Sequence, residues 1–127
     1  MLSVIDGRMG MEGDGPGDGQ PVKLNLALAG RDSLAADVVA AHLMAFSLGQ
    51  IGYLWYGAQQ GLGVGNLGET AVVGDSLADC RGPFRPHRTF PEQLHWREER
   101  AMQLALGTRC RLPACKEGMC HSLCGYA

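Results

Sequence analysis

Three carboxylates near the beginning of the sequence have the type and spacing of oxygen ligands for a small cation. Glu12 and Asp14 lie two positions apart in the run Met-Glu-Gly-Asp-Gly-Pro, and Asp6 precedes them at the end of a short apolar run. Gly13 and Gly15 let main-chain N–H groups approach a ligand, and Mg²⁺ and Ca²⁺ prefer oxygen ligands of this kind. We therefore predict a loop that binds a small ligand or a divalent cation. The alternative is a solvated acidic turn in which Asp and Gly serve only turn geometry.

Asp37 is a further candidate for this site. It lies inside an otherwise apolar helical segment, where an unpaired carboxylate is costly. It therefore either faces a cavity, a cation or another polar group, or lies at the one solvent-facing edge of the helix. Asp32, at the start of the same segment, has the simpler interpretation of a helix N-cap.

The C-terminal tail carries four cysteines with the spacings x4, x4 and x3: Cys110, Cys115, Cys120 and Cys124. The bacterial ferredoxin run is C-x2-C-x2-C-x3-C-P, so only the last interval agrees, and Gly125 stands where that run has proline. Zinc is held by four thiolates, or by three thiolates and an imidazole such as that of the adjacent His121. An iron–sulfur cluster, a zinc ion and no metal are thus three open interpretations. Cys80 stands apart and is predicted to be a free cysteine.

Composition and charge exclude several classes of protein. With 11 Lys+Arg against 13 Asp+Glu and a net charge of −2, the chain lacks the basic footprint of a nucleic-acid-binding protein. No apolar run approaches the roughly 20 residues that cross a bilayer. The first residues lack the basic region and long apolar core of a signal peptide, so we expect a cytoplasmic location, where disulfides are disfavoured.

The elements that position these residues alternate between strands and helices. Residues 2–6 are predicted to form a short buried strand, and residues 7–21, with six Gly and two Pro, a long loop. Residues 22–29 alternate between apolar and less apolar positions, which predicts a second strand. Residues 34–46 are apolar on almost every face, which predicts a helix buried on more than one side. A capping-box pattern at Ser47 predicts a second helix, with Gly61 as its stop.

The second half of the chain is less regular. Residues 70–74 are predicted to be a third strand, followed by an irregular connection, and residues 91–106 a charged helix. The fold class is therefore α/β, a small layered sheet with helices on its faces and a cysteine-rich tail. We divide the chain into residues 1–88 and an appendage over 89–127. Three strands and an all-round apolar helix need more partners than this chain offers, so we expect an incomplete domain that self-associates or meets a partner chain.

Several runs resemble a known family. They are Val4-Ile5-Asp6-Gly7, Gly10-Met11-Glu12-Gly13-Asp14-Gly15-Pro16, Leu26-Ala27-Leu28-Ala29-Gly30-Arg31-Asp32, residues 36–46 and Val72-Val73-Gly74-Asp75. Together they resemble the family catalogued as domain of unknown function 362. The resemblance runs from about residue 3 to residue 85 and covers the C-terminal part of the family's usual length. It implies an association with ferredoxin-like iron–sulfur segments, because members of the family often carry them.

Two functional hypotheses follow. The first is a redox-associated or iron–sulfur-linked accessory protein whose acidic loop holds a small molecule or cation and whose cysteines hold a metal. The second is a non-catalytic binding or assembly fragment that needs a missing N-terminal half. Neither hypothesis involves nucleic acid or a membrane, and no residue is assigned a catalytic role, because the sequence identifies no reaction.

Overall fold

The structure of the chain is a computed structural model that describes residues 2–94. The chain divides into two compact units, Met1–Arg88 and Thr89–Ala127. The first contains a two-stranded antiparallel sheet and short helices, which confirms a mixed α/β fold. In the second unit the structure describes helix α4 (Phe90–Gln93), so most of the helix predicted over 91–106 lies outside the described residues. None of the described helices has both the length and the apolar character needed to cross a membrane.

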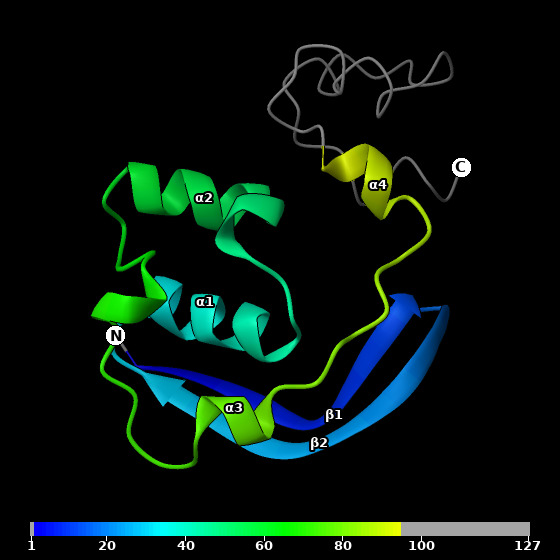
Figure 1. Cartoon of the computed structure of the whole chain (residues 1–127), viewed down its shortest axis with the longest axis horizontal. Helices are drawn as coiled ribbons and strands as arrows, with labels where there is room; N and C mark the ends of the chain where they lie inside the picture. The colour runs from blue at the N-terminus through cyan, green and yellow to red at the C-terminus, as the bar shows by residue number, and fades with distance from the viewer. Residues whose placement is uncertain (1, 95–127) are drawn as a thin grey trace. The chain divides into compact units, whose positions relative to one another are not determined.

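A long hairpin forms the base of the first unit (Figure 1). Strand β1 (Ser3–Asp14) pairs with β2 (Asp18–Gly30) from Ser3↔Gly30 to Asp14↔Asp18. The predicted loop over residues 7–21 is therefore wrong, because these residues form most of β1, the turn and the start of β2. Glycine has no side chain to mark the alternation of a strand, so sequence periodicity could not reveal this half of the hairpin. The glycines leave room for packed neighbours. A Cβ on Gly10 would lie 2.8 Å from the ring of Phe84.

A β-bulge lies in the middle of the hairpin. The register changes between Gly7↔Leu26 and Met9↔Lys23, so Arg8 faces two residues of β2, Leu24 and Asn25. Asn25 has a φ of 55°, a left-handed conformation that asparagine tolerates better than most residues. The predicted strand over 22–29 is confirmed. Its even-numbered apolar residues are half-buried beneath the helices, and its odd-numbered residues are exposed.

Helix α1 (Ser33–Leu43) lies between the hairpin and helix α2 (Gly52–Gln59), as Figure 1 shows. This position explains why α1 is apolar on more than one side, as predicted. Its buried residues are Ala35, Ala36, Val38, Val39, Ala41 and Leu43. The centre of the core is Leu54 of α2, which is fully buried and packs with Val38 and Ala41 of α1.

The second predicted helix is divided into a 3₁₀ turn, η1 (Leu48–Gln50), and α2. The Gln50 side chain accepts a hydrogen bond from the Ser47 backbone N–H at 2.8 Å, as the capping-box pattern predicts. Gly61 ends α2 with a φ of 68°. The Leu62 N–H donates to the Gly57 carbonyl at 3.0 Å and the Gly61 N–H donates to the Ala58 carbonyl at 3.1 Å, which together form a Schellman motif.

The third predicted strand does not form. Residues 70–74 are irregular and lie between a 3₁₀ turn, η2 (Leu67–Glu69), and the single turn of helix α3 (Leu77–Cys80). Val73 is 98% exposed, so this apolar run buries almost none of that side chain. A short β-branched run forms a strand only where a neighbouring strand pairs with it.

Asp32 fixes the start of α1 and also holds a distant loop. Its Oδ1 accepts from the Ala35 N–H at 3.0 Å, which confirms the predicted N-cap, and its Oδ2 accepts from the Val64 N–H at 2.7 Å. The hydrogen bonds from Ala35 and Val64 lower the pKa of Asp32 below its ordinary value of 3.8. The carboxylate form is therefore favoured in the folded state.

The lowered pKa of Asp32 predicts that Asp32→Asn changes the free energy of unfolding by an amount that depends on pH. A depressed folded-state pKa stabilises the fold above the unfolded pKa, and the contribution is lost as the pH falls through the folded pKa. The wild type should exceed Asp32→Asn in free energy of unfolding at neutral pH, and the difference should shrink below pH 3.8. Urea denaturation of both proteins over a pH series measures this difference. A difference that stays constant with pH would contradict the prediction.

Candidate functional site

The structure does not bring the three predicted carboxylates together. Asp6 and Glu12 both lie on β1, six residues apart. At a rise of about 3.3 Å per residue, six residues along a strand span roughly 20 Å. Asp6 is exposed and accepts a hydrogen bond from the Arg8 backbone N–H at 2.9 Å. It therefore cannot share one cation with Glu12 and Asp14.

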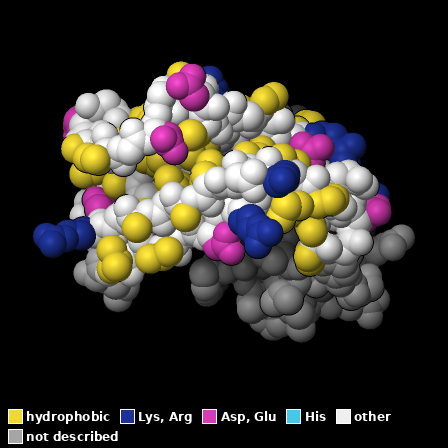
Figure 2. Space-filling view, turned by 90° about the horizontal axis from the view of Figure 1, so that it is seen from below, with side chains coloured by type: hydrophobic (Ala, Val, Ile, Leu, Met, Phe, Trp, Pro, Cys, Tyr) yellow, Lys and Arg dark blue, Asp and Glu magenta, His cyan; other side chains and the backbone are white. Residues whose placement is uncertain are grey.

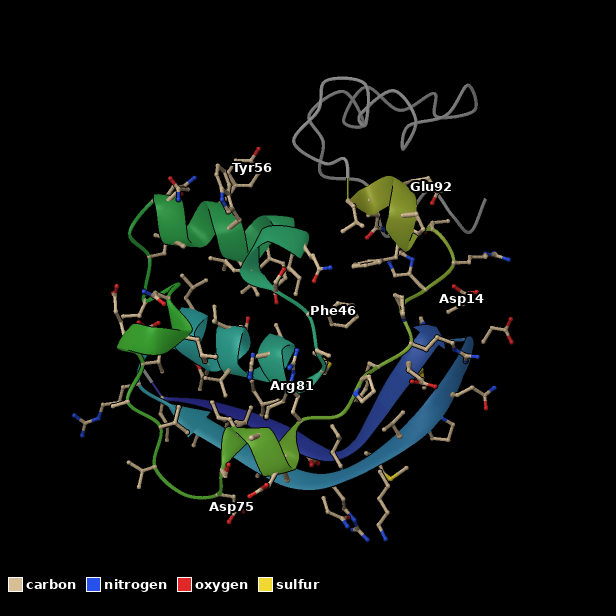
Figure 3. The ribbon with its side chains drawn as sticks, viewed as in Figure 1. Asp14, Phe46, Tyr56, Asp75, Arg81 and Glu92 are labelled. Carbon is tan, nitrogen blue, oxygen red and sulfur yellow. The ribbon has the colours of Figure 1, made fainter. Side chains whose placement is uncertain are left out.

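Glu12 and Asp14 instead hold a later segment of the chain, residues 82–88, which we call the strap. The Arg85 N–H donates to Glu12 Oε2 at 2.8 Å and the Arg88 N–H donates to Asp14 Oδ1 at 2.9 Å. The two guanidinium groups add long ion pairs to the same carboxylates, at 3.9 Å and 3.7 Å. Figure 3 shows Asp14 at the end of the hairpin where the turn joins the two strands. Neither interpretation of the sequence anticipated these contacts, in which both carboxylates are engaged by the strap.

The two predicted glycines of this segment have different surroundings. The Gly13 N–H donates to the Arg85 carbonyl at 2.8 Å, and a Cβ on Gly13 would lie 3.0 Å from the Arg85 guanidinium. Its φ of 76° is also unfavourable for other residues. Gly15 lies in the turn, where a Cβ would meet the side chain of Met11. Glycine at position 13 therefore allows the strap to lie close to β1.

The strap also joins the hairpin to the end of α1. The Gly82 N–H donates to the Leu43 carbonyl at 2.9 Å and the Phe84 N–H donates to the Met44 carbonyl at 3.2 Å. Arg81, just before the strap, donates from Nε to the His42 carbonyl at 3.2 Å (Figure 3). Sequence reasoning missed this role. The available signal was Phe84, an isolated aromatic residue between two prolines that is buried in the structure.

Asp37 is half-buried on α1 and faces α2. The Tyr53 hydroxyl donates to its Oδ2 at 3.4 Å. Burial, followed by the negative charge of Asp37 and this hydrogen bond, raises the pKa of Tyr53 above its ordinary value. Of the environments predicted for Asp37, the structure shows another polar group, the Tyr53 hydroxyl. Within residues 2–94, no three or more His, Cys, Asp or Glu side chains form a group that could hold a metal ion.

The cysteines contribute little to the described structure. Cys110, Cys115, Cys120 and Cys124 lie outside the described residues, so the predicted metal site of the tail has no structural account. Cys80, in α3, is a free and half-buried cysteine, as predicted.

A hollow of about 700 Å³ lies among α1, residues 46–48, Ala58 and residues 63–69. Its wall is mostly apolar, with His42, Ser47, Asn66 and Glu69 as its polar members. The Asn66 amide donates to Glu69 Oε1 at 2.9 Å, and the Ser47 hydroxyl donates to Gln50 Oε1 at 3.1 Å. The Ser47 hydroxyl is thus bonded to an amide rather than to a base, so this contact does not make it a nucleophile.

The outward surface of the hairpin is the most distinctive feature of the first unit. We call it the outer face. It consists of Leu2, Val4, Asp6, Met9 and Met11 on one side and Pro21, Lys23, Asn25, Ala27 and Ala29 on the other, all of them exposed. Its four large apolar side chains, those of Leu2, Val4, Met9 and Met11, are between 48% and 67% exposed. Figure 2 looks onto this side of the molecule and shows hydrophobic side chains with a few charged ones among them. Such a surface is suited to binding rather than to bond-making chemistry.

Comparison with known proteins gives one match. The sequence model of a family described as Domain of unknown function (DUF362) matches residues 1–42, the N-terminal third of this chain. The matched segment includes the hairpin and almost all of α1. The resemblance expected from the sequence extends further, to about residue 85. No curated protein and no solved structure matches the chain.

Proposed function

We propose that the chain is a non-catalytic binding module that associates with another polypeptide through the outer face of its hairpin. The observation that carries this proposal is the row of exposed apolar side chains on a two-stranded sheet whose opposite face, within the described residues, packs against α1. A hairpin alone is only marginally stable in water and gains stability when it packs against another element. A large exposed apolar surface is typical of protein-binding sites.

The size of the apolar surface is consistent with association. Full burial of a large apolar side chain contributes about 1.5–3 kcal/mol, and these four are already partly covered, so each would add about 1 kcal/mol. If both partners contribute such surface, the gain is about 8 kcal/mol, which exceeds the lower estimates of the cost of association, about 4 kcal/mol. A weak or moderate complex is the expected result.

The family resemblance leaves two candidates for the partner. We propose that residues 1–88 correspond to the C-terminal part of the family's domain, beyond the matched residues 1–42. The polypeptide that covers the outer face is then a second copy of this chain or a chain that supplies the rest of such a domain. In either case the function is assembly.

Methionine oxidation tests whether the outer face is covered. Hydrogen peroxide converts exposed methionine to its sulfoxide, and Met9 and Met11 are 54% and 48% exposed. We expect both residues to oxidise readily in dilute purified protein and much more slowly in cells that express the full chain. Met44 is the internal control, because it is half-buried by the fold itself and lies outside the outer face. Equal protection of all three residues, or rapid oxidation of Met9 and Met11 in cells, would refute the proposed function.

A redox-associated or iron–sulfur-linked accessory role is the second candidate. The observation in its favour is the group of four cysteines in residues 110–124. Such a role requires reduced thiolates and therefore fits a cytoplasmic location. Anaerobic purification of the full chain, followed by absorption spectroscopy and elemental analysis, distinguishes iron with a coloured cluster from zinc without colour. Replacement of all four cysteines by serine should remove whichever metal is bound, and the absence of both metals would reject this candidate.

The same hypothesis places a small ligand or cation at Glu12 and Asp14. A cation there would compete with the strap for the carboxylate oxygens that now accept from Arg85 and Arg88. If such a cation binds, it raises the melting temperature by mass action, and the double variant Glu12→Gln/Asp14→Asn loses that rise. A rise that persists in the double variant would exclude this site.

A further inference from the structure

The charges on the outer face identify its partner. Within the apolar surface, this face carries one acidic and one basic residue, Asp6 on β1 and Lys23 on β2. Asp6 is paired with Ala27, and Lys23 is paired with Met9, on the other side of the bulge. The two charges are therefore offset by three positions of β1 along the strands, a distance of about 10 Å.

We infer that a second copy of this chain covers the outer face, in a two-fold dimer in which Asp6 of each copy meets Lys23 of the other. This inference rests on the proposed function and names its partner. A two-fold interface presents the same surface twice, so every contact between two different residues occurs in two copies. The two-fold axis lies in the plane between the two faces and is the perpendicular bisector of the line from Asp6 to Lys23. Rotation about this axis places each Asp6 carboxylate opposite the Lys23 ammonium group of the other copy.

The same operation brings the apolar parts of the surface together. Because it exchanges the two ends of the hairpin, it brings the Val4 and Ala29 end of one copy over the Met11 and Pro21 end of the other. Unbranched methionine side chains adapt to irregular surfaces such as one made by Val and Ala. Asp6 keeps an oxygen for the partner, because the Arg8 N–H donates to its Oδ1 and no hydrogen bond from residues 2–94 reaches its Oδ2. Arg8 is a further exposed cation near this site, and its position in the bulge leaves it without a partner residue of its own in the ladder.

Charge exchange between the two residues tests the arrangement in the full-length chain. Sedimentation analysis over a concentration series should show a monomer–dimer equilibrium for the wild type. Asp6→Lys or Lys23→Asp alone replaces two attractive contacts by two repulsive ones, so each should raise the dissociation constant about tenfold or more. The double variant Asp6→Lys/Lys23→Asp restores both attractive contacts with their signs reversed and should return the dissociation constant to near that of the wild type.

Two further variants separate this inference from the proposed function. Val4→Asp should weaken the dimer through the apolar surface, and Leu62→Asp, which alters a 72% exposed leucine after α2, should leave it unchanged. A dimer that is weakened by Val4→Asp but not restored by the double charge variant would overturn the Asp6–Lys23 contact. A wild type that stays monomeric at all concentrations, while Met9 and Met11 are protected in cells, would refute the second copy as partner and leave the proposed function standing. Rapid oxidation of both methionines in cells would refute both.

Discussion

Leu54→Ala is expected to lower the free energy of unfolding of the first unit by about 3 kcal/mol, the largest effect of a single substitution that we predict. Leu54 has no exposed surface and lies at the centre of a small core. It packs with Val38 and Ala41, and partly buried residues surround this cluster: Leu34, Phe46, Leu48, Ile51 and Leu67. Removal of its side chain leaves a cavity that so few neighbours cannot fill without moving α1 relative to α2.

Urea denaturation of the full chain, followed by far-UV circular dichroism, measures this loss. Leu62→Ala is the matched control, because Leu62 is 72% exposed and such substitutions usually change stability by less than about 0.5 kcal/mol. Equal stabilities of the two variants would show that α1 and α2 do not pack around Leu54. A loss of the cooperative transition in Leu54→Ala would agree with the prediction, because native domains have a margin of only about 5–15 kcal/mol.

Gly10→Val is expected to have the second large effect on stability. The sign of the stability change distinguishes a hairpin from a loop at this position. In the hairpin, a Cβ at this position would lie 2.8 Å and 2.9 Å from two ring carbons of Phe84. Valine must therefore displace Phe84 and the strap, and overpacking of this kind costs about 1–3 kcal/mol. In an open loop, the same substitution would reduce the freedom of the unfolded chain and leave stability unchanged or slightly higher.

The control for this position is Gly17→Ala. Gly17 lies in the hairpin turn, where an added Cβ would meet no atom within 4 Å. We expect its melting temperature to equal or slightly exceed that of the wild type, whereas Gly10→Val should melt several degrees lower. If Gly10→Val were as stable as Gly17→Ala, the contact between β1 and Phe84 would be refuted.

The three carboxylates of the hairpin have different roles, because two of them bind the strap and the third lies in the proposed dimer interface. Glu12 and Asp14 are engaged within the chain, where they accept from the backbone of Arg85 and Arg88. Within residues 2–94, Asp6 accepts only a local hydrogen bond, from the Arg8 N–H, and it lies on the exposed side. Three residues that look equivalent in the sequence thus divide into two that hold the fold and one that is available for association.

The sequence by itself determined the elements whose signals are local. The N-cap at Asp32, the apolar faces of α1, the alternation over residues 22–29 and the stop at Gly61 each depend on residues within a few positions of one another. Side-chain periodicity and capping chemistry reveal such elements because their hydrogen bonds close within one or two turns, or because burial repeats along one strand. The mixed α/β class followed from them.

Only the tertiary structure decided the rest. Residues 7–14 became a strand because β2 pairs with them and because Gly10, at an inward position, admits Phe84, a residue far along the chain. Residues 70–74 have a better strand composition and remain irregular, because no strand pairs with them. Pairing and close packing between distant segments leave no local period in the sequence, so the acidic, glycine-rich segment could be predicted as a loop although its carboxylates hold the strap.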